Sequence, residues 1–224
     1  MSKLFIVATP IGNLNDITLR ALEVLRSADV VLAEDTRMAK KLLSHFDVQK
    51  AVMSYHKFSG KGAEEKVLEL LEEGKNIALV TDAGTPGISD PGYWLVKKAA
   101  AAGFAVVPVP GASSLSAIIS VSDIDLSRFS FLGFPPHKKG RQTFFREVAA
   151  SSIPVVIFES PHRILKTLKE LESVAGDRYV NIGRELTKIY EEIFRGKISE
   201  AITHFTGEKE RGEFVIVLDP TNYK

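Results

Sequence analysis

Residues Ile77–Gly92 read IALVTDAGTPGISDPG, an apolar run followed by a loop rich in glycine and proline. The run Ile77–Val80 has the length and composition of a short buried strand. The loop Thr81–Gly92 holds three glycines and two prolines, far above average usage. Glycine lets a ligand approach the main chain, and proline fixes the path of the backbone. This stretch therefore predicts a strand of an α/β sheet with a functional loop at its carboxyl end.

The same alternation of strand-like and helical segments extends through the first half of the chain. Strands are predicted at Leu4–Ala8, Val30–Ala33, Ala51–Ser54, Ile77–Val80 and Ala105–Val109. Amphipathic helices are predicted between them at Thr18–Ala28, Met38–Phe46, Glu64–Glu73 and Tyr93–Ala102. Short strands that alternate with helices indicate a mostly parallel sheet with helices on its faces.

A second series of elements follows the Ser/Asp-rich segment Ser120–Ser127. Strands are predicted at Phe129–Leu132, Val155–Phe158, Tyr179–Ile182, Ile189–Phe194 and Phe214–Leu218. Helices are predicted at Arg141–Ala150, Ile164–Val174 and Ile198–Phe205. The pattern favours two domains, an N-terminal one over residues 1–118 and a C-terminal one over residues 119–224.

The composition restricts the classes of protein that fit. With 45% hydrophobic and 25% charged residues, the chain resembles a globular protein. It has no cysteine, which excludes disulfides and thiolate metal sites. Its apolar runs are shorter than the roughly 20 residues that span a bilayer, so we expect a cytoplasmic protein without a membrane partner. A net charge of +1 argues against general electrostatic binding of nucleic acid, although a local basic patch is compatible with it.

Four polar or glycine-rich loops follow the strands predicted for the first half. They are Thr9–Asn13, Glu34–Arg37, Thr81–Gly92 and Pro110–Ser114. In an open α/β sheet, ligands bind beyond the carboxyl ends of the strands. One such loop is more often a simple turn, but four at one edge predict a ligand site.

Familiar signatures of other ligand sites are missing from the sequence. The G-x-G-x-x-G pattern and the phosphate-binding G-x-x-x-x-G-K-[ST] pattern are both absent, which counts against NAD and nucleoside-triphosphate enzymes. The five histidines lie far apart, so we expect no metal site.

Eight ordered motifs carry a resemblance that covers nearly the whole chain. They are Ala8–Leu14, Glu34–Arg37, Thr81–Gly92, Pro108–Ser114, Phe131–Pro136, Phe158–Arg163, Arg184–Lys188 and Gly212–Phe214. Together they resemble the branch of the tetrapyrrole-methylase superfamily that methylates small-subunit ribosomal RNA. Relatives that act on tetrapyrroles carry G-D-P where this chain has Gly84-Thr85-Pro86, and this difference favours the RNA branch.

The resemblance implies two α/β domains, with a mostly parallel N-terminal sheet and a mixed C-terminal sheet. It implies S-adenosylmethionine in the cleft between the domains, a homodimer, and 2′-O-methylation of a cytidine ribose within the assembled small subunit. Many members of the branch continue into a further C-terminal helical segment, whereas this sequence ends at Lys224.

Cofactor contacts follow from the resemblance, position by position. In the first domain they are expected at Pro10, Gly84, Thr85, Pro86, Gly87, Ile88, Ser113 and Ser114. In the second domain they are expected at Phe158, Glu159, Leu186 and Phe214. Turn amides can bind the carboxylate and ribose of the cofactor, and apolar side chains can flank its adenine.

Methyl transfer to a ribose hydroxyl needs alignment and a nearby base, but no metal. The sequence favours Glu34, Asp35 and Arg37 for this role, with Arg37 able to bind a phosphate bidentately. Asp35 is equally suited to capping the helix that follows it. Further candidates for the base are Glu185, Lys188 and Glu213, of which Glu185 and Lys188 can instead pair with each other.

The densest basic run, His137–Arg141, is the candidate RNA contact. Lys138, Lys139 and Arg141 are predicted to bind phosphates, although short charge runs are often only solvated surface. Trp94 is predicted to pack in the core. Two alternatives stay open: a methyltransferase acting on a small tetrapyrrole-like substrate, and a nucleotide-binding regulatory module without catalysis.

Overall fold

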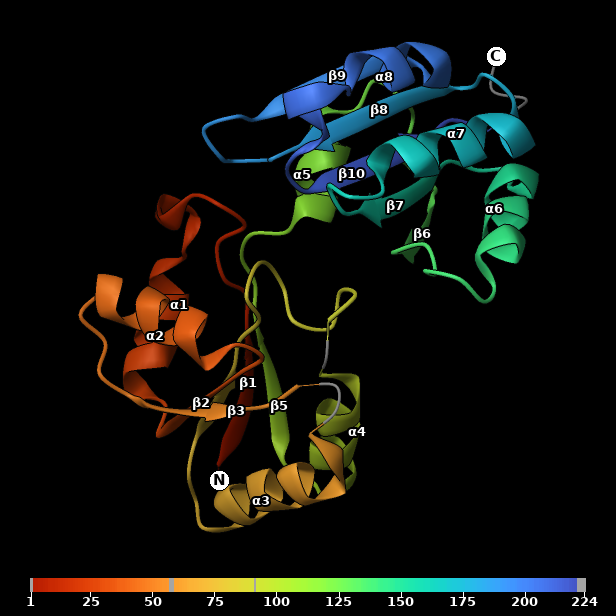
Figure 1. Cartoon of the computed structure of the whole chain (residues 1–224). Helices are drawn as coiled ribbons and strands as arrows, with labels where there is room; N and C mark the ends of the chain where they lie inside the picture. The colour runs from red at the N-terminus through yellow and green to blue at the C-terminus, as the bar shows by residue number, and fades with distance from the viewer. Residues whose placement is uncertain (1, 57–58, 91, 221–224) are drawn as a thin grey trace. The chain divides into compact units, whose positions relative to one another are not determined.

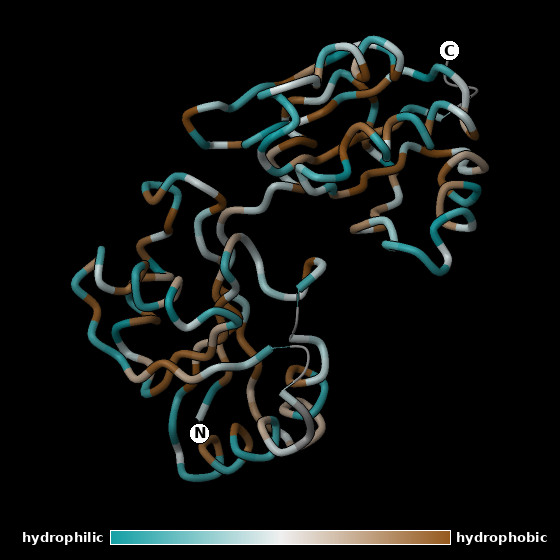
Figure 2. The backbone as a smooth tube through the Cα atoms, in the orientation of Figure 1, coloured by the Kyte–Doolittle hydropathy of each residue, from teal (hydrophilic) through white to brown (hydrophobic). Residues whose placement is uncertain are grey.

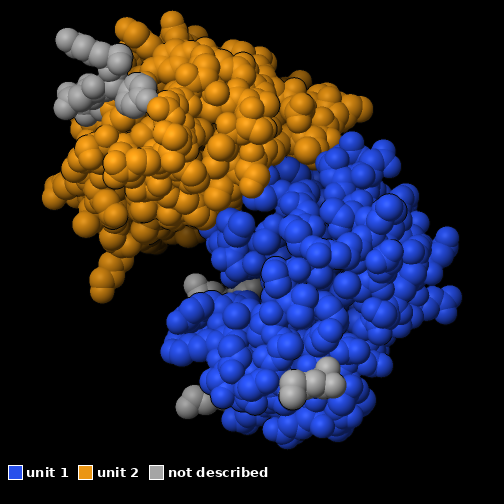
Figure 3. Space-filling model, turned by 180° about the vertical axis from the view of Figure 1, so that it is seen from behind, with its two compact units in different colours: residues 1–113 blue, residues 114–224 orange. Residues whose placement is uncertain are grey.

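The computed structural model describes residues 2–56, 59–90 and 92–220, and it divides into two compact units. Figure 3 colours unit 1, Met1–Ser113, and unit 2, Ser114–Lys224. The boundary lies five residues before the predicted one (118 − 113). The reason is a helix over Ser114–Val121 that the sequence did not predict. A Cβ placed on Gly183 of unit 2 would lie 3.0 Å from its residue Ile118, so this helix packs with unit 2.

Unit 1 is a five-stranded sheet with helices on both faces (Figure 1). Its strands are β1 (Lys3–Val7), β2 (Val30–Ala33), β3 (Ala51–Ser54), β4 (Ile77–Leu79) and β5 (Ala105–Val109). Its helices are the 3₁₀ turn η1 (Leu14–Asp16), α1 (Leu19–Ser27), α2 (Thr36–His45), α3 (Gly60–Glu72) and α4 (Tyr93–Ala101). The strand order is β3-β2-β4-β1-β5, and every neighbouring pair is parallel. The predicted parallel sheet is therefore confirmed.

Alternate residues of these strands are buried on opposite faces of the sheet. Val7 and Val31 pack with α1 and α2 in one cluster, whereas Leu4 and Leu32 pack with α3 and α4 in another. The strands accordingly appear as brown, hydrophobic segments in Figure 2. Burial on both faces explains why the strands are nearly continuous apolar runs.

The strand order creates a switch point between β1 and β4. After β1 the chain crosses over β4 to reach β2, and after β4 it crosses over β1 to reach β5. The two connections leave the sheet in opposite directions, which opens a crevice between their loops at the carboxyl edge. The loops Thr9–Asn13 and Thr81–Gly92 therefore start from the place where such a sheet binds its ligand.

Unit 2 is a mixed five-stranded sheet, as the resemblance implied. Its strands are β6 (Ser130–Gly133), β7 (Val155–Glu159), β8 (Tyr179–Arg184), β9 (Glu192–Lys197) and β10 (Phe214–Leu218), in the order β6-β7-β10-β8-β9. Its helices are α5 (Ser114–Val121), α6 (Arg141–Ala150), α7 (Ile164–Ala175), α8 (Ile198–His204) and the 3₁₀ turn η2 (Gly207–Glu210). Only β6 and β7 pair in parallel, because β10 and β9 run antiparallel to their neighbours.

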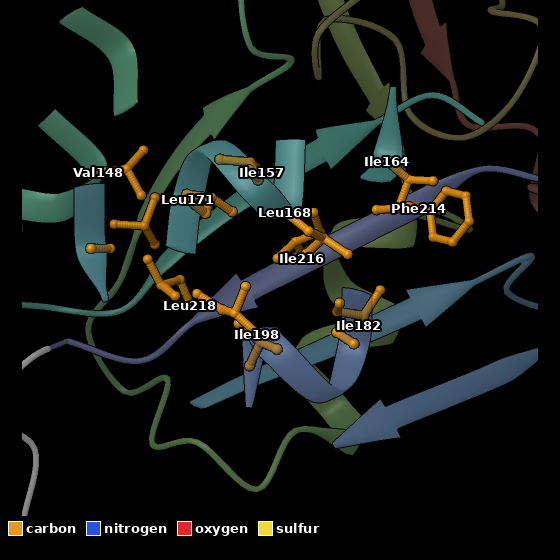
Figure 4. Close-up of a cluster of buried hydrophobic side chains, with 14 of the residues drawn as sticks. Val148, Ile157, Ile164, Leu168, Leu171, Ile182, Ile198, Phe214, Ile216 and Leu218 are labelled. Carbon is orange, nitrogen blue, oxygen red and sulfur yellow. The ribbon is translucent and has the colours of Figure 1, made fainter. Parts of the chain in front are cut away.

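The core of unit 2 fills the space between this sheet and the helices α6, α7 and α8. Figure 4 shows Ile157, Ile182 and Ile216 of the sheet pointing toward Leu168 of α7 and Ile198 of α8. These five side chains are at most 2% exposed. Close packing of this kind supplies most of the stability of a small α/β unit.

Two predictions about individual segments are wrong. The strand predicted at Ile189–Phe194 is β9, which begins at Glu192 and not at Ile189, because Ile189 and Tyr190 belong to the exposed turn before it. Trp94 is 59% exposed, since Leu95 and Ala99 form the face of α4 that packs in the core. No helix within the described ranges is long and apolar enough to cross a membrane.

Candidate active site

The loops that leave β1 and β4 are tied together at the switch point. Thr9 and Gly84 form an isolated antiparallel bridge, with N–H···O distances of 2.9 and 3.1 Å. The Thr9 hydroxyl also donates to the carbonyl of Thr81 at 3.1 Å. Thr9 and Thr81 are both buried. The two loops therefore form one rigid pair, although 75 residues separate Thr9 from Gly84.

The turn after β5 joins the same assembly. The hydroxyl of Thr85 donates to the carbonyl of Ala112 at 3.1 Å. Gly111 lies so close to β1 that a Cβ in its place would be 3.0 Å from the Cβ of Ala8. The predicted convergence of the loops at Pro10, Thr85 and Ser113 on one sheet edge is thus what the structure shows.

Gly87 occupies a different position from Gly84 within this assembly. Both have positive φ, +80° at Gly84 and +89° at Gly87, a region that favours glycine. A Cβ on Gly84 would contact Ile11 at 3.3 Å, whereas a Cβ on Gly87 would have no atom within 4 Å among the described residues. The main chain at Gly87 is therefore open to a ligand.

The residues predicted for catalysis follow β2 at the same edge. Asp35 caps α2 by accepting a hydrogen bond from the Arg37 amide at 2.8 Å. Its carboxylate also binds the Arg37 guanidinium at 2.7 Å. The hydrogen bond from the Arg37 side chain lowers the pKa of Asp35 to about 2. Asp35 is thus a capping residue and a weak base, while Glu34 is exposed beside it.

Sequence reasoning missed two acidic residues of the loop after β4. Asp82 accepts a hydrogen bond from the main-chain amide of Asp35 at 3.2 Å, which joins this loop to the β2 loop. Asp90 has a pKa raised to about 6, first by desolvation and then by the negative charges of Glu34 and Asp82. Three carboxylates from two loops therefore share one region of the edge. The acidic residues were visible in Thr81–Gly92, but their proximity to Glu34 depends on the strand order.

The four cofactor positions predicted in unit 2 also lie at one sheet edge. Phe158 and Glu159 end β7, Leu186 follows β8, and Phe214 begins β10 opposite Glu159 and Arg184. All four side chains are at most 9% exposed. A ligand at this edge can therefore be contacted mainly through the backbone, with the buried side chains shaping the loops.

The carboxylate of Glu159 is bound by its own unit. It pairs with Arg163 at 2.7 Å and accepts hydrogen bonds from the Ser160 amide at 2.6 Å and the Thr167 hydroxyl at 2.5 Å. Arg163 also donates to the carbonyl of Pro135 at 3.0 Å. This network connects β7, α7 and the loop after β6. The Glu159 side chain therefore has a structural role.

The turn after β8 is held in an unusual conformation. Glu185 and Thr187 have φ of +50° and +67°, values that are uncommon for residues other than glycine. The Glu185 carboxylate binds Lys188 at 2.8 Å and the Glu213 amide at 2.9 Å. Although desolvation acts against it, the hydrogen bond from Lys188 lowers the pKa of Glu185. The predicted alternative, pairing of Glu185 with Lys188, is what the structure shows.

The basic run at 137–141 contains two kinds of side chain. Lys138 and Lys139 are exposed. Arg141 is 6% exposed and binds Glu170 at 2.7 Å, Thr167 at 2.8 Å and the carbonyl of Pro136 at 3.1 Å. The predicted phosphate contact at Arg141 conflicts with this burial, because its guanidinium already holds α6 to α7.

A groove of about 490 Å³ lies between α6 and α7 beside this run. Its lining includes His137, Lys138, Arg146 and Lys166, with Glu170 as its acidic member. Glu170 is bound to Arg141, so basic groups dominate the surface of the groove. An anionic ligand would be attracted to it.

Comparison with known proteins places these features in a family. A family model described as Tetrapyrrole (Corrin/Porphyrin) Methylases matches residues 3–202. A Thermotoga maritima protein named "Ribosomal RNA small subunit methyltransferase I" is 47% identical over 218 residues, covering 97% of this chain and 98% of the relative. A Halalkalibacterium halodurans protein of the same name is 44% identical over 223 residues, covering 99% of this chain and 77% of the relative.

Solved structures agree with the predicted fold. Uroporphyrin-III-C-methyltransferase from Thermus thermophilus matches with a TM-score of 0.66 and 17% identity, over 98% of this chain and 94% of its own. A cobalt precorrin-4 methyltransferase matches with a TM-score of 0.68 and 21% identity, over 97% and 94%. At this level of identity the likeness shows the fold alone.

Proposed function

We propose that this chain, which belongs to the tetrapyrrole methylase family, transfers a methyl group from S-adenosylmethionine to small-subunit ribosomal RNA. The chain is a methyltransferase, since its relatives at 44–47% identity carry that activity in their names. The proposed acceptor is the 2′-hydroxyl of a cytidine ribose.

The observation that carries this proposal is an alignment with a named relative over nearly the full length of both chains. The Thermotoga maritima protein is matched over 98% of its length, so the comparison includes both units of this chain. The tetrapyrrole-acting proteins share the fold at 17–21% identity. This difference favours RNA over a small tetrapyrrole-like substrate.

The residues of unit 1 fit the cofactor by the chemistry of their edge. S-adenosylmethionine carries positive sulfonium and ammonium groups, which suit the region of Glu34, Asp82 and Asp90. The open main chain at Gly87 suits close approach of a ligand. The proposed cofactor residues of this unit remain Pro10, Gly84, Thr85, Pro86, Gly87, Ile88 and Ser113. Those proposed for unit 2 are Ser114, which begins α5, and Phe158, Glu159, Leu186 and Phe214.

The bound cofactor supplies an electrophilic methyl group, and the chain supplies alignment and a proton acceptor. The proton of the ribose hydroxyl must leave as the oxygen attacks. Of the acidic residues at the edge, Asp90 has a pKa of about 6, near neutrality, which suits a general base. We propose that Glu34 assists Asp90, because its negative charge helps to raise the pKa of Asp90. Asp35 holds Arg37, and Arg37 stays a proposed phosphate contact because it is largely exposed.

RNA binding is proposed for the exposed part of the basic run. Lys138 and Lys139 are exposed, and Lys138 also lines the groove between α6 and α7. With a net charge of +1, the chain depends on such local patches to attract phosphates. We further propose a cytoplasmic homodimer that acts on the assembled small subunit.

Methyl transfer tests the proposal directly. The wild-type chain is incubated with S-adenosylmethionine labelled in the methyl group and, in parallel, with small ribosomal subunits, naked small-subunit RNA or a porphyrinogen. Label in RNA at a cytidine 2′-oxygen is expected. Label in the porphyrinogen alone, or in none of the three, would contradict the proposal.

A further inference from the structure

Helix α4 begins with two aromatic side chains that the core does not use. Tyr93 is 63% and Trp94 is 59% exposed, while Leu95 and Ala99 of the same helix are fully buried. The two rings meet edge to face with centroids 5.2 Å apart. Aromatic rings contribute to stability mainly through burial, so folding alone gives no reason for two exposed rings at this position.

A lysine completes this surface. Lys97 Nζ lies 5.1 Å from the centre of the Trp94 ring, and helical spacing puts it on the same face as Tyr93 and Trp94. Its neighbour Lys98 is instead bound to Glu64 at 2.5 Å. We call Tyr93, Trp94 and Lys97 the aromatic platform.

The platform starts at the edge of unit 1 that holds the candidate active site. Helix α4 follows the loop after β4, so its first turn lies at the carboxyl edge of the sheet (Figure 1). A Cβ on Gly92 would lie 3.9 Å from the Gly87 nitrogen. The residue before Tyr93 thus lies near Gly87, where the main chain is open to a ligand.

We propose that the aromatic platform stacks an unpaired base of the RNA substrate next to the reacting nucleotide. The inference rests on the proposed function, since it takes the acceptor to be RNA. Proteins bind unpaired nucleotides by stacking bases on aromatic rings and by placing cations near the phosphates. Two rings and a lysine supply both.

The native protein contains its own probe, because Trp94 is the only tryptophan in the chain. Its fluorescence is recorded while a short single-stranded oligoribonucleotide of mixed sequence is added, after saturation with S-adenosylmethionine. Stacking is expected to quench the emission. An abasic ribose-phosphate strand of the same length is expected to bind through its charge and leave the emission unchanged. Equal quenching by both strands, or by neither, would overturn the proposal.

Variants separate stacking from folding. Trp94→Ala is expected to weaken RNA binding on the order of tenfold to a hundredfold and to raise the KM for RNA with little change in kcat. Trp94→Phe keeps a ring and is expected to restore most of the affinity. Tyr190→Ala removes an equally exposed aromatic ring of unit 2 and serves as the matched control. Circular dichroism checks that each variant is folded.

The outcomes distinguish a failure of the aromatic platform from a failure of the proposed function. If the wild type methylates small-subunit RNA but Trp94→Ala leaves RNA binding and KM unchanged, the platform is wrong and the function stands. If the wild type methylates no RNA, the proposed function fails first. Sedimentation that shows a change of oligomeric state in Trp94→Ala would assign the surface to a second copy and overturn the inference.

Discussion

The two sheet edges differ in how their acidic residues are compensated. At the edge of unit 2, the buried Glu159 is neutralised by Arg163 and by hydrogen bonds from Ser160 and Thr167. At the edge of unit 1, Asp90 is partly desolvated and also lies near the negative charges of Glu34 and Asp82. Glu159 is thus neutralised by its own unit. At the edge of unit 1, Asp35 is paired with Arg37, but Asp90 lies near like charges at a cost to stability.

This difference separates a charge that serves the fold from charges that we propose to serve a ligand. A buried carboxylate paired with arginine fixes the path of a loop. Carboxylates that repel one another are stabilised when a cation or a hydrogen-bond donor arrives, and such perturbed groups cluster at functional sites. Four variants test the comparison.

Removing the cation beside Glu159 in unit 2 should change the free energy of unfolding more than any other variant. Arg163→Ala leaves the Glu159 carboxylate buried without its cation, which is expected to lower the free energy of unfolding of unit 2 by about 3–5 kcal/mol. Denaturation is followed by far-ultraviolet circular dichroism for both units and by Trp94 fluorescence for unit 1. Lys166→Ala, at an exposed position of the same helix, is the control. It should change the free energy of unfolding by less than about 0.5 kcal/mol. A loss of similar size in both variants would mean that the network is not stabilising.

A side chain at the open glycine should block the ligand at the other edge. Gly87→Val adds a branched side chain where the main chain is open, and we expect affinity for S-adenosylmethionine to fall at least tenfold, or about 1.4 kcal/mol. The positive φ adds strain of about 1–2 kcal/mol. Gly74→Val is the matched control, because Gly74 has φ of +86° and equally open surroundings. Calorimetry that gives both variants the same affinity would remove Gly87 from the cofactor site.

Removing two exposed lysines should weaken RNA binding without affecting the fold. Lys138→Ala with Lys139→Ala is expected to reduce the slope of log K against log salt by about 1.4 on single-stranded RNA, or about 0.7 for each lost contact. Arg141 is left in place because it is part of the buried network. Lys40→Ala with Lys41→Ala, two exposed lysines of α2, removes the same charge. Equal slopes for the two double variants would assign the basic run to solvated surface.

The smallest effect concerns the pKa of Asp90. Glu34→Gln removes one of the negative charges that raise it, so the pKa should fall from about 6 toward 3.8, as measured by carbon NMR of the carboxyl group. Glu23→Gln, on the exposed surface of α1, should leave it unchanged. Because the folded-state pKa lies above the unfolded value, ionisation of Asp90 destabilises the fold above pH 6, and this penalty disappears as the pH falls to about 4. An unchanged pKa in Glu34→Gln would separate Glu34 from Asp90.

Local sequence patterns were enough to predict the strands, most helices and the edge at which the loops of unit 1 meet. Apolar runs of strand length are local features, and the parallel topology then brings their carboxyl ends together. The helix α5 was not predicted, because its segment Ser114–Val121 follows a polar turn and has one buried residue, Ile118. The predicted contacts with a cofactor between the two domains stay a prediction.

Which charged and aromatic side chains are available to a ligand depends on how the helices and loops pack together. Arg141 looked like part of a basic run, but α7 supplies Thr167 and Glu170 to bury it. Trp94 looked like a core residue, but Leu95 and Ala99 fill that position on α4. Asp90 looked like an ordinary loop residue until the strand order placed Glu34 near it. Burial and pKa depend on partners distant in sequence, and local patterns carry no information about those partners.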